Sequence, residues 1–222
     1  EYIRYLNRST GKVRTGIGAG REDVNVSCRG GSRVEIKGVS HNLWIPSLSH
    51  NEAFRQYALL NIKSVLNKAV PDRKSWKIDS REIKLSDTAL DSCFRVIPLR
   101  LPECRGVLSH FTQPGHCFAS ELENRLKVIA CIEKPNMIHS EDPDDTGNKE
   151  FWQKIGSMLK AGNNDSMLVL WGPDADIPTA IETIEERMEM AFEGVPNETR
   201  KSFPDGTTIF ERVLPGSDRM YP

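Results

Sequence analysis

Two short stretches near the start of the chain alternate polar and apolar residues with a period of two. They cover residues 23–27 and 33–37, and such alternation is typical of half-buried β-strands. Between them, Arg29-Gly30-Gly31-Ser32 supplies the positive-φ positions of a tight turn. The pattern therefore predicts a β-hairpin. Its apolar face would consist of Val24, Val26, Val34 and Ile36.

A long helix is predicted after this hairpin. Ser49 and Glu52 have the spacing of a capping box, so we expect the helix to begin at Ser49. Apolar residues then recur at helical spacing until Pro71 ends the run. This stripe consists of Phe54, Ala58, Ile62, Val65, Leu66 and Ala69.

From Phe94 onward, strand and helix patterns alternate. Strands are expected at 95–99, 136–139 and 166–170, and helical stripes run from Phe118 to Ile129 and from Phe151 to Leu159. The last helix has the clearest boundaries, with Asp176 as N-cap, Pro178 in the first turn and Gly194 after its end. Residues 195–222 are polar and rich in turns, notably at Pro204-Asp205-Gly206. The chain is therefore expected to have an α+β fold.

The composition narrows the class of protein. With 38% apolar and 27% charged residues among 222, the chain is typical of a globular protein. Its net charge of -1 gives no general positive field, so DNA is not an expected partner. Five cysteines without a C-x-x-C pair indicate reduced thiols, and no apolar run is long enough to cross a bilayer. We expect a cytoplasmic protein that is not inserted in a membrane.

The polar face of the predicted hairpin is the first candidate for chemistry. It carries Asp23, Asn25, Ser27, Arg33, Glu35 and Lys37. Carboxylate oxygens suit Mg²⁺, and nearby cations, with Arg21 adding another, suit phosphate groups, so the face could support phosphoryl transfer. A solvated sheet face would show the same pattern. Both interpretations remain open from the pattern alone.

Three other motifs are less specific. Gly16, Gly18 and Gly20 could bring backbone N–H groups close to a phosphate, although a strand bulge or close backbone packing explains them as well. The spacing of the possible zinc ligands matches no standard site. These are Cys104, His110, His116 and Cys117. The run 139–142 could bind a cation, but a polar strand exit is the simpler interpretation.

Separated stretches resemble one protein family, the B and E subunits of tRNA-dependent amidotransferases. The stretches 10–18, 21–27 and 30–38 are similar to the cradle domain that these subunits share. The stretches 101–108 and 138–142, with Glu121-Leu122 between them, resemble the GAD domain, an insertion also found in bacterial-type aspartyl-tRNA synthetases. The runs 172–181, 194–200, 205–208 and 219–222 resemble the E subunit in particular.

The resemblance implies an activity and a set of site residues. Such a complex uses ATP and Mg²⁺ to activate the γ-carboxylate of Glu-tRNA(Gln), and ammonia from an asparaginase-like D subunit then forms Gln-tRNA(Gln). By its motif, Glu35 would be a catalytic metal ligand with Asp23, and Arg21 and Lys37 would bind the phosphate or carboxylate charge. The expected nucleotide-binding residues are Gly16, Gly18, Gly20, Asn25 and Ser27.

The resemblance also implies an arrangement of domains. Residues 1–90 would form part of the β-rich cradle with its long helix, residues 91–195 the GAD insertion, a sheet covered by helices, and residues 196–222 the return to the cradle. We expect a segment of a longer protein that is inactive alone. The alternatives are a non-catalytic GAD-containing module that binds tRNA or protein and, with less support, part of an aspartyl-tRNA synthetase.

Overall fold

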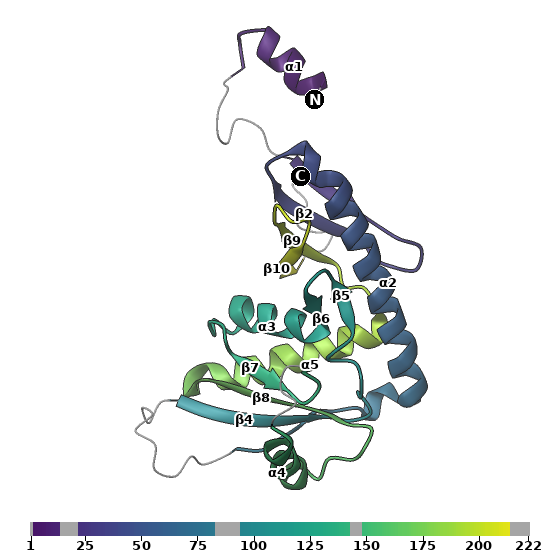
Figure 1. The fold of residues 1–222 in the computed structure, drawn as a ribbon, viewed down its shortest axis with the longest axis vertical. Helices are drawn as coiled ribbons and strands as arrows, with labels where there is room; N and C mark the ends of the chain where they lie inside the picture. The colour runs from purple at the N-terminus through teal and green to yellow at the C-terminus, as the bar shows by residue number, and fades with distance from the viewer. Residues whose placement is uncertain (1, 14–21, 83–93, 143–147, 214–222) are drawn as a thin grey trace.

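The computed structural model describes residues 2–13, 22–82, 94–142 and 148–213. Helices are α1 (Tyr2–Ser9), α2 (Ile45–Ala69), α3 (Phe118–Ile129), α4 (Lys149–Leu159) and α5 (Ile177–Glu193), with short 3-10 turns η1 (Asn42–Trp44), η2 (Arg73–Ser75) and η4 (Asp174–Asp176). Strands are β1 (Glu22–Val26), β2 (Val34–Val39), β3 (Asp79–Ser80), β4 (Phe94–Leu101), β5 (Phe111–Gln113), β6 (His116–Cys117), β7 (Met137–His139), β8 (Ser166–Pro173), β9 (Glu198–Ser202) and β10 (Thr208–Val213). The predicted α+β class is confirmed (Figure 1).

The predicted hairpin forms one half of a four-stranded sheet in the order β1-β2-β9-β10. Strands β1 and β2 pair antiparallel, and so do β9 and β10, whereas β2 and β9 run parallel. Val34 and Ile36 are fully buried, as their alternation predicts. The strands β9 and β10 correct the interpretation of 195–222 as merely polar and turn-rich. Their buried charges, Glu198 and Arg200, are tolerated because they pair with each other and with charged residues of the helices.

A second sheet has the order β3-β4-β8-β7 and is covered by helices on both faces. Leu99, Leu168 and Leu170 belong to the main core, while Val169 packs with Ile155 on the other side. Figure 1 shows α3 and α5 on one side of this sheet and α4 on the other. The predicted elements around it are confirmed, although the domain boundaries remain a prediction.

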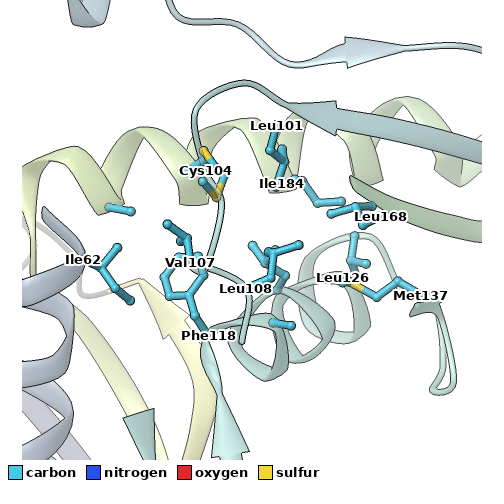
Figure 2. Close-up of a cluster of buried hydrophobic side chains, with 14 of the residues drawn as sticks. Ile62, Leu101, Cys104, Val107, Leu108, Phe118, Leu126, Met137, Leu168 and Ile184 are labelled. Atoms are coloured by element: carbon cyan, nitrogen blue, oxygen red, sulfur yellow. The ribbon is translucent and has the colours of Figure 1, made fainter. Parts of the chain in front are cut away.

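The main core lies between this second sheet and its helices. It includes Leu108, Phe118 and Leu126, none of which is exposed. Figure 2 shows these side chains converging with Ile184 from α5 and Ile62 from α2. One continuous core therefore joins the long helix to the second sheet.

The long helix differs from its prediction at the start and along its face. It begins at Ile45, with Pro46 in the first turn, and not at Ser49. Glu52 does not cap the helix, because its buried carboxylate accepts hydrogen bonds from Arg55 instead. The predicted end before Pro71 is confirmed.

The buried face of α2 is also rotated from the predicted stripe. Phe54 is 40% exposed and Val65 50% exposed, while Leu59 is buried. The reason is that the helix buries charged residues, so apolar periodicity alone does not locate its inner face.

Among the described residues, no helix has the length and apolar character needed to span a bilayer.

Strand β10 is held at its first residue by a side chain. The amide of Gln113, on β5, donates through Nε2 to the Thr208 carbonyl at 2.7 Å and accepts from the Thr208 N–H at 2.9 Å. The turn predicted at Pro204-Asp205-Gly206 precedes this strand and is confirmed. The Thr207 N–H donates to Asp205 Oδ1, and Gly206 has φ of 83°.

Candidate active site on the hairpin sheet

The polar face predicted from the alternation is present on the hairpin. Asn25 lies directly opposite Glu35, and Val24 opposite Ile36, so Asp23 falls on the same face as Asn25. Asp23, Asn25 and Ser27 are exposed. The structure therefore brings two predicted carboxylates, Asp23 and Glu35, to one face of adjacent strands.

A β-bulge shapes this face next to Glu35. The register shifts between Glu22, paired with Val39, and Val24, paired with Ile36. The extra residue lies on β2, where Gly38 has φ of 74°. Because glycine adopts positive φ without steric cost, Gly38 permits the bulge, and a bulge reorients side chains next to it.

The carboxylate of Glu35 has two described partners. Lys37 Nζ lies 3.4 Å from Glu35 Oε2, and Thr199 Oγ1 donates to the same oxygen at 3.3 Å. The side chains of Lys37 and Glu35 are 15% and 22% exposed. A half-buried carboxylate beside an ammonium group is thus held in place while remaining accessible to a ligand.

Most of the remaining predicted site residues lie outside the described part of the chain. These are Arg21 and the glycines Gly16, Gly18 and Gly20. Arg33 is described and exposed. In the described ranges, no group of three or more His, Cys, Asp or Glu side chains is arranged to hold a metal ion.

Sequence reasoning missed a second feature, a cluster of buried ions directly beneath the sheet. We call it the buried ion cluster: it comprises Glu52 and Arg55 of α2, Glu121 and Arg125 of α3, Arg187 of α5, and Glu198 and Arg200 of β9. Each of these side chains is at most 3% exposed. The four guanidiniums outnumber the three carboxylates by one.

Glu198 is a central acceptor of this cluster. Its carboxylate accepts from Arg125 Nη2 and Arg200 Nη1, both at 2.6 Å, and from Arg55. Burial alone would raise the pKa of Glu198, but the Arg55, Arg200 and Arg125 charges outweigh it and lower that pKa to about 2. Glu198 is therefore ionised and paired at neutral pH.

Glu121 is the second acceptor and faces the other helices. It accepts from Arg55 and, at 2.6 Å, from Arg187 Nη2. Burial opposes ionisation, yet Arg55 and Arg187 hold the pKa of Glu121 well below its usual range. Burial has the larger effect at Glu52, whose pKa is raised despite the charges of Arg55 and Arg200.

Aromatic rings complete the surroundings of two arginines. The Arg125 guanidinium lies 4.2 Å from the Phe210 ring centroid and that of Arg187 lies 4.6 Å from Phe118. These contacts, with the ion pairs, join α2, α3 and α5 to β9. The buried ion cluster thus fixes the hairpin sheet to the rest of the molecule.

Two of the residues considered for a cation, Cys104 and Glu141, have structural contacts. Burial raises the pKa of the Cys104 thiol well above its usual range, and its Sγ donates to the Pro102 carbonyl at 3.2 Å. Glu141 accepts from the N–H groups of Gly106 at 2.6 Å and Ser109 at 2.9 Å. The carboxylate of Glu141 therefore orders the loop after β4.

No model of a known protein family matches the chain. Individual relatives do match it, among them three proteins named as the E subunit of glutamyl-tRNA(Gln) amidotransferase. The relative from Sulfurisphaera tokodaii is 36% identical over 99% of this chain, that from Caldivirga maquilingensis 36% over 96%, and that from Pyrococcus abyssi 32% over 100%. The chain covers 37%, 35% and 36% of their respective lengths.

These matches run along nearly the whole chain. The chain therefore belongs to the family of glutamyl-tRNA(Gln) amidotransferase E subunits, as a segment that spans a little over a third of those relatives.

Proposed function

We propose that the polar face of the hairpin sheet is part of the site where the full-length protein activates the γ-carboxylate of Glu-tRNA(Gln) with ATP and Mg²⁺. The relatives' names give the substrate class. The observation that carries the proposal is the placement of Glu35, a half-buried carboxylate with Lys37 beside it and Asn25 opposite. Arg21 and the Gly16, Gly18 and Gly20 stretch, which precede β1 in the chain, would contribute as well.

The donor set fits Mg²⁺ bound together with a nucleotide. Mg²⁺ is usually held in such sites by one or two carboxylates, with water and phosphate oxygens completing its shell. Glu35 and Asp23 would supply the carboxylates, Asn25 an amide oxygen and Ser27 a hydroxyl group. The ion would neutralise charge on the phosphates during transfer. Lys37 would offset the charge of the same phosphates or of the substrate carboxylate.

The chemistry requires activation because a carboxylate resists attack by an amine. One oxygen of the γ-carboxylate would take the terminal phosphoryl group of ATP, and ADP would leave. Ammonia would then attack the carbonyl carbon, phosphate would leave with that oxygen, and loss of a proton would give the amide. A separate asparaginase-like partner, the D subunit, would supply the ammonia.

The test is the variant Glu35→Gln in the full-length protein assembled with the asparaginase-like partner, ATP, Mg²⁺ and Glu-tRNA(Gln). Amide formation should fall by at least about 100-fold, because a neutral amide binds Mg²⁺ more weakly than a carboxylate does, and the ion that neutralises the phosphate charge is then lost. The matched control is Glu211→Gln, an exposed carboxylate on β10 of the same sheet. Amidation by Glu35→Gln at the wild-type rate would refute the metal-ligand assignment.

A further inference from the structure

Thr199 occupies a particular position beside Glu35. The parallel pairing of β2 and β9 places it directly opposite Glu35, and its hydroxyl donates to Glu35 Oε2 at 3.3 Å. Thr199 itself is fully buried. The hydroxyl therefore reaches the carboxylate from the protein side and not from solvent.

The strand that carries Thr199 is held rigidly on both sides of it. Glu198 and Arg200 are its immediate neighbours, and both point the opposite way, into the buried ion cluster. Arg200 also donates from Nε to Thr208 Oγ1 at 2.7 Å and from Nη2 to the Thr208 carbonyl at 2.9 Å. Buried charges on α2 and α3, together with Thr208 of the neighbouring strand, thus hold the backbone on both sides of Thr199 in place.

Both described contacts of Glu35 fall on the same oxygen. Thr199 and Lys37 both contact Oε2, which leaves Oε1 available to a ligand. Hydrogen bonds of this kind orient the ligands of metal ions, and their removal typically costs about 10- to 100-fold in metal affinity.

We infer that Thr199 is a positioning residue for Glu35, and that the buried ion cluster acts on the site through it. This inference rests on the proposed function of Glu35. Thr199 does not touch the ligand; it holds Oε2 so that Oε1 faces Mg²⁺.

The decisive measurement compares Thr199→Val, which is nearly isosteric but lacks the hydroxyl, with Thr199→Ser, which keeps it. Mg²⁺ binding to the full-length complex is measured by titration calorimetry with a non-hydrolysable ATP analogue present, and the Mg²⁺ dependence of amidation is measured in parallel. Thr199→Val should raise the Mg²⁺ dissociation constant about 10- to 100-fold, and Thr199→Ser should stay within about threefold of wild type.

Several outcomes overturn the inference. Equal Mg²⁺ weakening in both variants would assign the effect to packing, and a loss of rate with unchanged Mg²⁺ affinity would assign it to general structure. Should Thr199→Val fail to fold, Thr199→Ala against Thr199→Ser answers the same question, since alanine also lacks the hydroxyl but introduces no apolar bulk.

Glu35→Gln separates this inference from the function on which it rests. If Glu35→Gln keeps wild-type Mg²⁺ affinity and activity, the proposed function fails. If Glu35→Gln loses both while Thr199→Val binds Mg²⁺ as wild type does, only the role of Thr199 is refuted.

Discussion

The two faces of the sheet formed by β1, β2, β9 and β10 use charge in opposite ways. On the outer side, Glu35 and Lys37 form a partly accessible pair with a separation of 3.4 Å. On the inner side, seven charged residues are withdrawn from water. Partly solvated ion pairs contribute little to stability, whereas the loss of one member of a buried pair leaves an uncompensated charge. We therefore expect the outer charges to matter for ligands and the inner ones for folding.

The largest expected effect tests this contrast directly. Glu198→Gln should lower the free energy of unfolding by about 3–5 kcal/mol, because Arg55, Arg125 and Arg200 lose their shared counter-charge. Urea unfolding followed by tryptophan fluorescence measures the change. Glu35→Gln and Glu211→Gln are the matched carboxylate controls and should stay within about 1 kcal/mol of wild type. Similar losses in all three variants would remove the distinction between the faces.

A second, smaller effect is a loss of folding stability at low pH. The pKa of Glu198 is lowered from its ordinary value of 4.5 to about 2, and that of Glu121 is also lowered. A lowered pKa in the folded state gives stability that is complete above pH 4.5 and is lost as the pH falls toward 2. Glu52 has the opposite shift and offsets part of this loss.

The urea midpoint should therefore decrease between about pH 4.5 and 2, and it should decrease less steeply in Glu198→Gln than in wild type. An identical slope in the two proteins would mean that Glu198 is not ionised and paired in the native state.

The smallest expected effect is the loss of stability caused by a substitution at the bulge beside the outer face. Gly38→Ala should destabilise the protein by about 1–2 kcal/mol, because the residue has φ of 74°. A Cβ there would meet only Ser202 Oγ, at 3.8 Å, so the cost comes from the backbone. Gly38→Asn serves as the control, since asparagine tolerates this conformation better. Equal costs for alanine and asparagine in thermal unfolding would argue against the bulge as the cause.

The features of the outer face of the sheet could be predicted from the sequence, whereas the charges on its inner face could not. The hairpin, its turn and its polar face follow from two alternating stretches and a turn within residues 23–37, which is a local signal. The ends of α5 were also predictable, since Pro178 and Gly194 act locally. The family resemblance supplied the expected role of Glu35, which the pattern left open.

The buried ion cluster had no such signal. Its members come from three helices and one strand, and Glu52 and Arg200 are 148 positions apart in the chain. Each residue taken alone resembles an ordinary solvated charge, because burial depends on partners that only the fold brings together. The spacing between Ser49 and Glu52, which is that of a capping box, also led to the wrong prediction that the helix begins at Ser49.

The side chain of Gln113 has a consequence for association between molecules. Among the described residues, β10 is the last strand of its sheet, and the outer edge of such a strand can recruit an extended segment from another chain. At Thr208 the glutamine amide already forms both hydrogen bonds that an incoming strand would make there. The side chain of Gln113 thus blocks intermolecular β-pairing at one end of this edge.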